Sequence, residues 1–211
     1  MTQATLATVG RGFGQPVHDA QQVFRTTLQA MSRPGRVLQL PPPLLAALQA
    51  PGLSPGLTAL LLSLLDAETS LWLAPDLATD EAQQYLRFHT GVRWAASPAE
   101  AAFVVVGAAQ ARPGLLSLLD RGSDEAPQAG ATLIVDLTSL RPALPGQPGV
   151  LTLRGPGIQS QHLLAAVDVP APFWRARVEL EADYPRGIDL IMCSGDRLAA
   201  VPRTTRVALG A

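Results

Sequence analysis

The sequence predicts one layered α/β domain with a mostly parallel or mixed sheet, and three observations support this. Segments with strand-like and helix-like patterns alternate along most of the chain, as in proteins whose strands are joined by crossover helices. Residues 101–106 form a continuous apolar run, which is typical of a strand buried on both faces. The chain has 211 residues, 47% of them hydrophobic, so a single domain with a substantial core is expected.

The helices are predicted from apolar spacing and from the residues that bound each segment. In the first helix Phe24, Leu28 and Met31 lie at i, i+4 and i+7, which makes one apolar stripe. Asp19 is a suitable N-cap, and residues 32–35 end the helix because proline cannot continue it and glycine can adopt a left-handed cap. The expected helices cover residues 19–31, 56–65, 79–89, 112–119 and 173–180.

The strands are predicted from short apolar runs bounded by turn residues. The last two runs are joined by Ser194-Gly195-Asp196, so they are expected to form a strand pair that closes the sheet. Residues 1–15 are small, polar and glycine-rich and are expected to form a flexible arm, which leaves residues 16–211 as the domain. The expected strands cover residues 36–40, 70–73, 101–106, 131–137, 149–153, 188–193 and 197–201.

The composition excludes several functions. Charged residues make up 16% of the chain, below the roughly 25% of an average soluble protein, so another chain is expected to cover part of the surface. A formal net charge of −1 lacks the excess of positive charge that is typical of nucleic-acid-binding proteins. The chain contains no lysine, and therefore neither a Schiff-base lysine nor a P-loop lysine.

No segment predicts a membrane or export function. The longest apolar run, Leu57 to Leu65, is too short to span a bilayer, and the first residues lack the pattern of a signal peptide. We therefore expect a cytoplasmic protein with no membrane partner.

Residues that commonly bind metals or carry nucleophilic chemistry are sparse. Cys193 is the only cysteine, and its position in an apolar strand predicts a buried, inert thiol. His18, His89 and His162 are spread along the chain without the spacing of metal ligands. No metal site and no bound cofactor are expected.

The last predicted strand runs directly into a Pro-Arg-Thr-Thr-Arg segment. Guanidinium groups match the geometry of phosphate or carboxylate, and threonine hydroxyls add neutral donors. The alternative is an edge strand protected by proline and charge. Asp189 is a lone acid in an apolar strand, where an unpaired charge is costly, so it is expected to pair with one of the two arginines. The candidate anion-binding or structural residues are Arg203, Thr204, Thr205, Arg206 and Asp189.

Four further polar residues lie near predicted helix ends and are candidate interface residues. His18 and Asp19 precede the first helix, where local capping and a subunit contact are the alternatives. Arg87 and His89 lie in the last turn of the 79–89 helix, where a histidine complements the negative end of the helix dipole. No nucleophile is evident near His89 in the sequence, so a role as general base is not supported.

Five segments of the chain resemble, in order, those of the PhnH family, which supplies a subunit of the bacterial carbon–phosphorus lyase system for phosphonate use. The C-terminal one reads Tyr-Pro-x-Gly-Ile-Asp-Leu-Ile followed by Val-Pro-Arg-Thr-Thr-Arg. Arg186 stands where an apolar residue is common in the family. The five segments cover residues 16–35, 86–91, 127–134, 153–158 and 184–206.

The resemblance implies a fold similar to that of pyridoxal-phosphate-dependent transferases but without the cofactor. It also implies a homodimer and association with the PhnG, PhnI and PhnJ subunits in a core complex. With ATP and an associated ATP-binding subunit, that system displaces adenine with methylphosphonate to give α-D-ribose 1-methylphosphonate 5-triphosphate. The chain is expected to be an accessory subunit that is not catalytic alone. The alternative is an autonomous binding protein or transferase for a phosphorylated small molecule that uses the C-terminal cluster.

Overall fold

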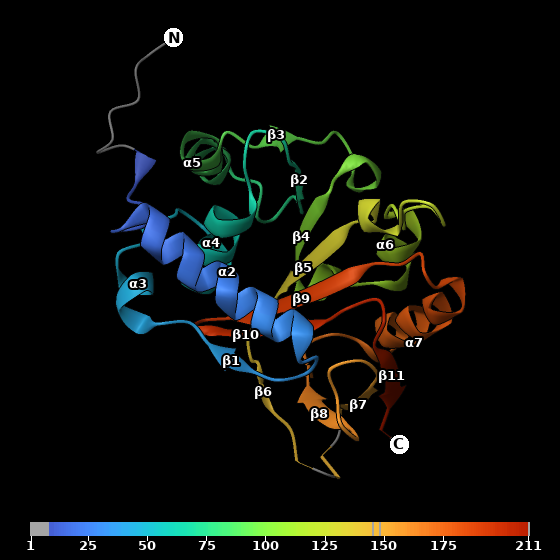
Figure 1. Cartoon of the computed structure of the whole chain (residues 1–211). Helices are drawn as coiled ribbons and strands as arrows, with labels where there is room; N and C mark the ends of the chain where they lie inside the picture. Colours follow the sequence, from blue (N-terminus) through green and yellow to red (C-terminus); the bar gives the residue numbers. More distant parts are fainter. Residues whose placement is uncertain (1–8, 145, 148, 211) are drawn as a thin grey trace.

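The computed structural model describes residues 9–144, 146–147 and 149–210, and a seven-stranded mixed sheet lies at its centre (Figure 1). The strands from β9 to β3 are parallel, whereas β10 and β1 are antiparallel to their neighbours. This confirms the predicted α/β class with a mixed sheet. The spatial order is β1 (Leu38–Gln39), β10 (Arg197–Val201), β9 (Asp189–Ser194), β5 (Thr132–Asp136), β4 (Phe103–Gly107), β2 (Ser70–Leu73) and β3 (Arg93–Trp94).

The central strands are buried on both faces, as their apolar runs predicted. In β5, Leu133 and Val135 pack into one apolar cluster and Ile134 into another, because successive side chains of a strand point to opposite faces. These two clusters lie on opposite sides of the sheet. This double burial explains why β4 and β5 read as continuous apolar runs instead of alternating ones.

Helices cover both faces of the sheet. One face packs against α2 (Pro16–Ser32), α4 (Pro55–Leu64) and α5 (Asp80–Thr90), and the other against α6 (Pro113–Leu118) and α7 (Ala171–Glu179). In Figure 1, α2 crosses in front of β9 and β10. The remaining helical segments are α3 (Pro42–Ala46), η1 (Pro98–Glu100), η2 (Ala108–Gln110), η3 (Pro127–Ala129) and η4 (Leu180–Asp183). None of the described helices combines the length and the apolar character that a membrane crossing requires.

The start of α2 differs from the prediction. The helix begins at Pro16 with Gln15 as its N-cap, because proline is well suited to the first helical position. Asp19 therefore lies inside the first turn, where its Oδ2 accepts a hydrogen bond from the Gln15 backbone N–H at 2.8 Å. Asp19 still satisfies a donor at the helix start, but its predicted position as the N-cap is wrong.

Two of the three residues in the predicted stripe of α2 face outward, whereas Met31 is partly buried against the core. Phe24 and Leu28 are 44% and 51% exposed, and Val17 on the same side is 74% exposed. The helix packs on α4 and β10 through smaller residues, namely Val23, Thr27 and Ala30. The spacing of the stripe is as predicted, but large apolar side chains are left on the surface of the described chain.

A second sheet of four antiparallel strands accompanies the first and was only partly predicted. Its order is β11 (Arg206–Leu209), β7 (Val150–Arg154), β8 (His162–Ala165) and β6 (Arg141–Pro142), of which only β7 was expected from the sequence. The chain passes from β10 in the first sheet to β11 in the second through residues 202–205, which we call the crossover. Since β10 lies between β9 and β1, it is not the edge strand of the alternative interpretation.

The residues just before α2 pack against the domain. Val9 is buried, and the Arg11 carbonyl accepts hydrogen bonds from the Tyr85 hydroxyl at 2.8 Å and from the Gln49 N–H at 2.9 Å. The described part of the expected N-terminal arm, residues 9–15, is therefore packed in place. Residues 1–8 of that arm lie outside the described residues.

Candidate functional site

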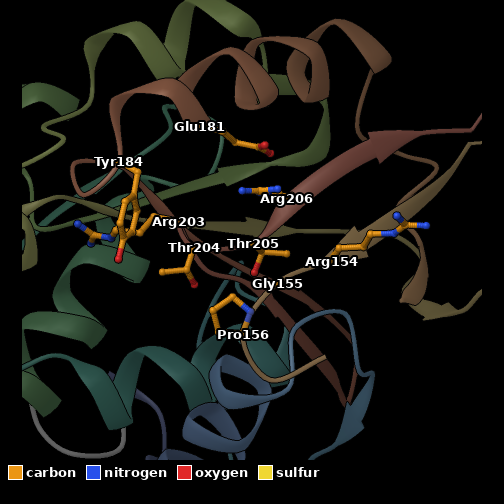
Figure 2. Close-up of a pocket in the computed structure, with 9 residues that line it drawn as sticks. All are labelled: Arg154, Gly155, Pro156, Glu181, Tyr184, Arg203, Thr204, Thr205 and Arg206. Atoms are coloured by element: carbon orange, nitrogen blue, oxygen red, sulfur yellow. The ribbon is translucent and has the colours of Figure 1, made fainter. Parts of the chain in front are cut away.

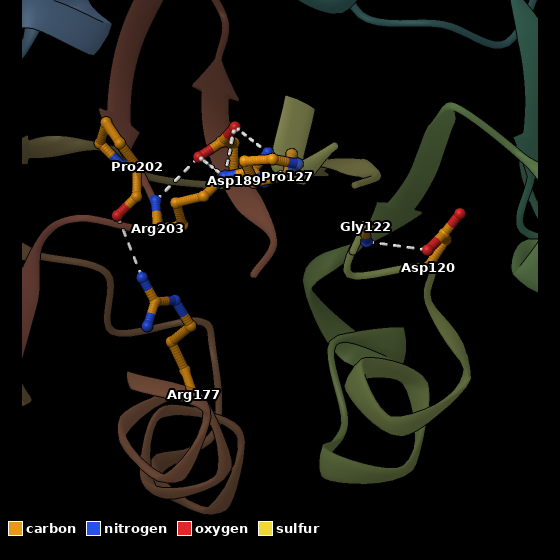
Figure 3. Close-up of polar contacts among 7 residues, drawn as sticks. All are labelled: Asp120, Gly122, Pro127, Arg177, Asp189, Pro202 and Arg203. Atoms are coloured by element: carbon orange, nitrogen blue, oxygen red, sulfur yellow. Dashed lines mark hydrogen bonds and ion pairs between the residues drawn. The ribbon is translucent and has the colours of Figure 1, made fainter. Parts of the chain in front are cut away.

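The crossover is held in a fixed turn by a buried arginine. The Thr205 N–H donates to the Pro202 carbonyl at 2.9 Å, which closes the turn. Arg177 of α7 is 2% exposed, and its Nη2 donates to the same Pro202 carbonyl at 3.0 Å (Figure 3). Arg177 was not singled out in the sequence. Its position four residues after Phe173, on the buried side of α7, is the only local sign that it points inward.

Arg203 forms the ion pair that was expected for Asp189. Its Nη2 lies 2.7 Å from Asp189 Oδ2, its Nε donates to both carboxylate oxygens at 3.2 Å, and its Nη1 donates to the Pro127 carbonyl (Figure 3). Asp189 Oδ1 also accepts the Arg203 backbone N–H at 2.8 Å. All three guanidinium nitrogens of Arg203 thus have hydrogen-bond partners inside the protein.

A second carboxylate balances the buried arginine. Glu181 Oε1 lies 3.9 Å from Arg177 Nη1 and accepts the Val207 N–H at 2.8 Å. Burial lowers the pKa of Arg177, and the negative charge of Glu181 opposes this shift. The pair connects α7 to β11 and so fixes both ends of the crossover.

A glycine turn from the second sheet packs directly against the crossover. Gly155 has φ of 137°, and a Cβ at this position would lie 2.9 Å from the Thr204 carbonyl oxygen. Gly157 has φ of 81°, and a Cβ there would lie 2.1 Å from the Ser32 carbonyl oxygen at the end of α2. Only glycine permits both the backbone conformation and the close approach. The turn therefore joins three segments that are far apart in the sequence.

A cavity of about 410 Å³ lies between the crossover and this turn (Figure 2). Thr204 and Arg206 from the predicted cluster lie at it with exposed side chains, whereas Thr205 is fully buried. Arg154 was missed in the sequence, because only the register of β7 with β11 brings it beside Arg206. The cavity is lined by Arg154, Gly155, Pro156, Glu181, Tyr184, Arg203, Thr204, Thr205 and Arg206.

The candidate interface residues lie elsewhere, around the start of α2 and the end of α5. His89 Nε2 lies 3.2 Å from the Gly10 carbonyl, and its ring packs on Tyr85 with centroids 4.4 Å apart. His18 is exposed, with Nδ1 3.7 Å from Asp19 Oδ1, and Arg87 is also exposed. His89 thus has a structural contact, while His18 and Arg87 stay on the surface.

Cys193 is buried, as predicted. Its Sγ donates weakly to Asp136 Oδ1 at 3.5 Å, and burial raises the pKa of the thiol. Across the described part of the chain, no group of three His, Cys, Asp or Glu residues is arranged to hold a metal ion.

The fold and the site define a class of protein: an α/β domain in which a C-terminal crossover between two sheets forms the wall of an arginine-lined cavity. Comparison with known families identifies the class more closely. The family described as bacterial phosphonate metabolism protein (PhnH) matches residues 11–208. The chain belongs to the PhnH family, as the five sequence segments indicated.

Two relatives are similar over nearly the whole chain. One is the alpha-D-ribose 1-methylphosphonate 5-triphosphate synthase subunit PhnH of Rhizobium meliloti, which is 34% identical over 195 residues, 92% of this chain and 93% of the relative. The other is the putative C-P lyase subunit protein HtxG of Stutzerimonas stutzeri, which is 34% identical over 190 residues, 90% of this chain and 86% of the relative. Both relatives are named as subunits of a larger assembly.

Proposed function

We propose that this protein is a subunit of the carbon–phosphorus lyase core complex in organic phosphonate breakdown. In this role it supports the formation of α-D-ribose 1-methylphosphonate 5-triphosphate from ATP and methylphosphonate. The observation that carries the proposal is the family match over residues 11–208, which leaves no large part of the chain unmatched. The relative from Rhizobium meliloti, whose name gives that product, aligns with 92% of the chain.

The proposed role is that of an accessory subunit. Several of the polar side chains considered in the sequence analysis make contacts that hold the fold. Arg203 and Asp189 neutralise each other, His89 contacts the Gly10 carbonyl, and His162 Nδ1 lies 2.6 Å from the Pro34 carbonyl. Such contacts favour a protein that contributes surface and stability to an assembly.

The outward stripe of α2 supports the proposal of a partner. Val17, Phe24 and Leu28 are spaced at seven and four residues, so they lie on one side of the helix. Large apolar side chains grouped on one face are typical of an interface that another chain covers. We propose that PhnG, PhnI or PhnJ covers this face in the complex, and that a second copy of the chain covers it in an isolated homodimer.

Two finer features accompany the proposal. The fold is proposed to resemble that of pyridoxal-phosphate-dependent transferases without use of the cofactor. The lysine-free sequence supports this, because those enzymes hold the cofactor through a lysine Schiff base. A cytoplasmic location is proposed because the pathway substrates include ATP.

Co-purification tests the proposed function. The tagged full-length chain is expressed with the other lyase subunits, and the recovered subunits are quantified. We expect Phe24→Ser and Leu28→Ser each to weaken association by about tenfold or more, because truncation of an apolar interface anchor costs about 2 kcal/mol.

A matched control is available on the opposite side of the sheet. Leu118 of α6 is 57% exposed and lies outside the α2 stripe, so Leu118→Ser should leave recovery unchanged. Failure of the unaltered chain to recover any subunit would contradict the proposed function. Equal recovery with all three variants would show instead that α2 is not the contact face.

A further inference from the structure

Two arginines that are partners on neighbouring strands lie at the edge of the cavity at the crossover, and Figure 2 shows the Arg154 side chain directed away from Thr204 and Thr205. Arg206 of β11 and Arg154 of β7 are partners in the antiparallel register, and both side chains are exposed. Side chains at such positions have Cβ atoms about 5 Å apart, and like charges placed there repel each other. No ion pair to either guanidinium is formed by any residue that the structure describes. The only side-chain partner of Arg154 in this part of the chain is the neutral Gln161, at 3.2 Å.

The other charges around the cavity cancel in pairs. Arg203 is neutralised by Asp189, and the buried Arg177 by Glu181, whose oxygen also accepts the Val207 N–H. Glu181 lines the cavity, but its negative charge is balanced by the buried Arg177. The positive charges that stay unbalanced therefore belong to the two opposed arginines.

A buried hydroxyl supplies an independent observation. Thr205 is fully buried, lies at the cavity wall, and its Oγ1 has no hydrogen-bond partner in the described structure. A buried hydroxyl without a partner costs free energy, so proteins seldom keep one. The neighbouring Thr204 exposes a second hydroxyl at the same wall, and Figure 2 shows both threonines beside Gly155 and Pro156.

We propose that this cavity binds a phosphate-type oxyanion, the phosphate or phosphonate group of a small molecule. Arg154 and Arg206 supply the charge, since guanidinium groups pair well with the oxygens of a tetrahedral anion. The hydroxyls of Thr204 and Thr205 supply neutral donors. Tyr184, 64% exposed at the rim, offers an aromatic surface to the organic part of the ligand. The volume of about 410 Å³ lies within the usual range of small-molecule sites.

The site differs from the cluster that the sequence suggested. Arg203 serves as a positioning residue, because its guanidinium is fully engaged and its backbone N–H is held by Asp189. Its place is taken by Arg154 of β7, the strand that pairs with β11. The inference concerns a property of the chain itself and does not depend on assembly with other subunits.

Calorimetric titration of the full-length chain with methylphosphonate and with inorganic triphosphate, at constant ionic strength, tests the inference. We expect saturable binding of at least one of these anions that weakens as sodium chloride is raised. Arg154→Gln and Arg206→Gln should each raise the Kd by about ten- to a hundredfold, because each removes a charge-assisted hydrogen bond. The control is Arg175, which is exposed on α7 and does not line the cavity. Arg175→Gln removes the same charge and should leave the Kd unchanged.

Thr205→Val separates a ligand contact from a merely structural role. Valine has nearly the shape of threonine, so without the anion the melting temperature should stay equal or rise, since an unpaired hydroxyl is removed. With the anion present, the variant should show a smaller rise in melting temperature than the unaltered chain. Absence of saturable binding to either anion would overturn the inference, as would equal weakening by Arg175→Gln and Arg206→Gln. Arg206→Gln leaves the α2 face intact, so the variant should still co-purify with the lyase subunits. The anion site and the proposed subunit role can therefore be refuted independently of each other.

Discussion

A partly buried carboxylate lies at each end of strand β9, Asp189 on β9 itself and Asp136 on the neighbouring β5, and the two are held in different ways. At the first end Asp189 forms an ion pair with the Arg203 guanidinium and accepts a hydrogen bond from the Arg203 backbone N–H. At the other end Asp136, which is level with Cys193 in the register, accepts only the Ser54 hydroxyl at 3.0 Å and the Cys193 thiol at 3.5 Å. No ion pair of Asp136 is formed within the described residues.

The difference is that one carboxylate has a cationic partner and the other, among the described residues, has only neutral hydrogen-bond donors. Burial raises the pKa of Asp136, although the hydrogen bonds from Ser54 and Cys193 lower it in part. Asp189 instead pairs with the Arg203 guanidinium and accepts the Arg203 backbone N–H, and these contacts fix the crossover. The arginine partner of Asp189 thus positions the candidate anion site, whereas burial disfavours the charged form of Asp136.

Replacement of Asp189 by asparagine gives the largest expected effect. Asp189→Asn leaves the guanidinium of Arg203, which is only 13% exposed, without its counter-ion, and loss of one partner from a largely buried pair costs about 2–4 kcal/mol. Urea denaturation measures the change in the free energy of unfolding. The exposed pair of Asp124 with Arg186, at 3.4 Å, is the control, and Asp124→Asn should cost less than about 1 kcal/mol.

A double-mutant cycle sharpens this prediction. If the pair is the cause, Asp189→Asn combined with Arg203→Gln should cost less than the sum of the single changes, because the second change removes the stranded charge. Strict additivity, or equal losses for Asp189→Asn and Asp124→Asn, would contradict the view that this end of β9 depends on its charge.

The same substitution at the other end of β9 should act in the opposite direction. Because the pKa of Asp136 is raised in the folded state, the wild-type chain loses stability as pH rises through that pKa. The loss of stability caused by ionising Asp136 is absent below the ordinary pKa range of aspartate. Asp136→Asn removes this penalty and keeps an oxygen that accepts from Ser54. At pH 7 the variant should therefore be as stable as the wild type or more stable.

A pH series of denaturation curves checks the sign. The advantage of Asp136→Asn should be greatest at neutral pH and should disappear as pH falls below the ordinary aspartate range. A loss of stability at pH 7 that is as large as for Asp189→Asn would mean that the Asp136 charge has a favourable partner after all.

Much of the first sheet could be predicted from sequence, whereas the second sheet and half of the candidate site could not. The runs that form β4, β5 and β9 are apolar because they are buried on both faces, and such continuous apolar runs can be recognised in the sequence alone. β8 and β11 are four residues long and begin with His162 and Arg206, so neither strand has a clear apolar pattern.

Long-range register explains the missed site residues. Asp189 was expected to pair with an arginine because an unpaired buried charge is costly. This argument uses only the residue type and its position in an apolar strand. Arg154 belongs to the site only through the pairing of β7 with β11, and Arg177 only through the packing of α7 on the crossover. In α2 the spacing of Phe24 and Leu28 was visible, but the side that faces the core was decided by the fit of smaller residues against α4.

The reactivity of Cys193 shows whether the two ends of β9 unfold together. The thiol is fully buried and its pKa is raised, so alkylation by a soluble reagent near pH 8 requires opening of the structure. If opening is global, Asp189→Asn should speed alkylation by the factor that its measured loss of stability implies, about a hundredfold for a loss of 3 kcal/mol. The control Asp124→Asn should change the rate by less than about fivefold. An unchanged rate in Asp189→Asn, despite a measured loss of stability, would mean that the crossover end opens alone while the Asp136 end stays closed.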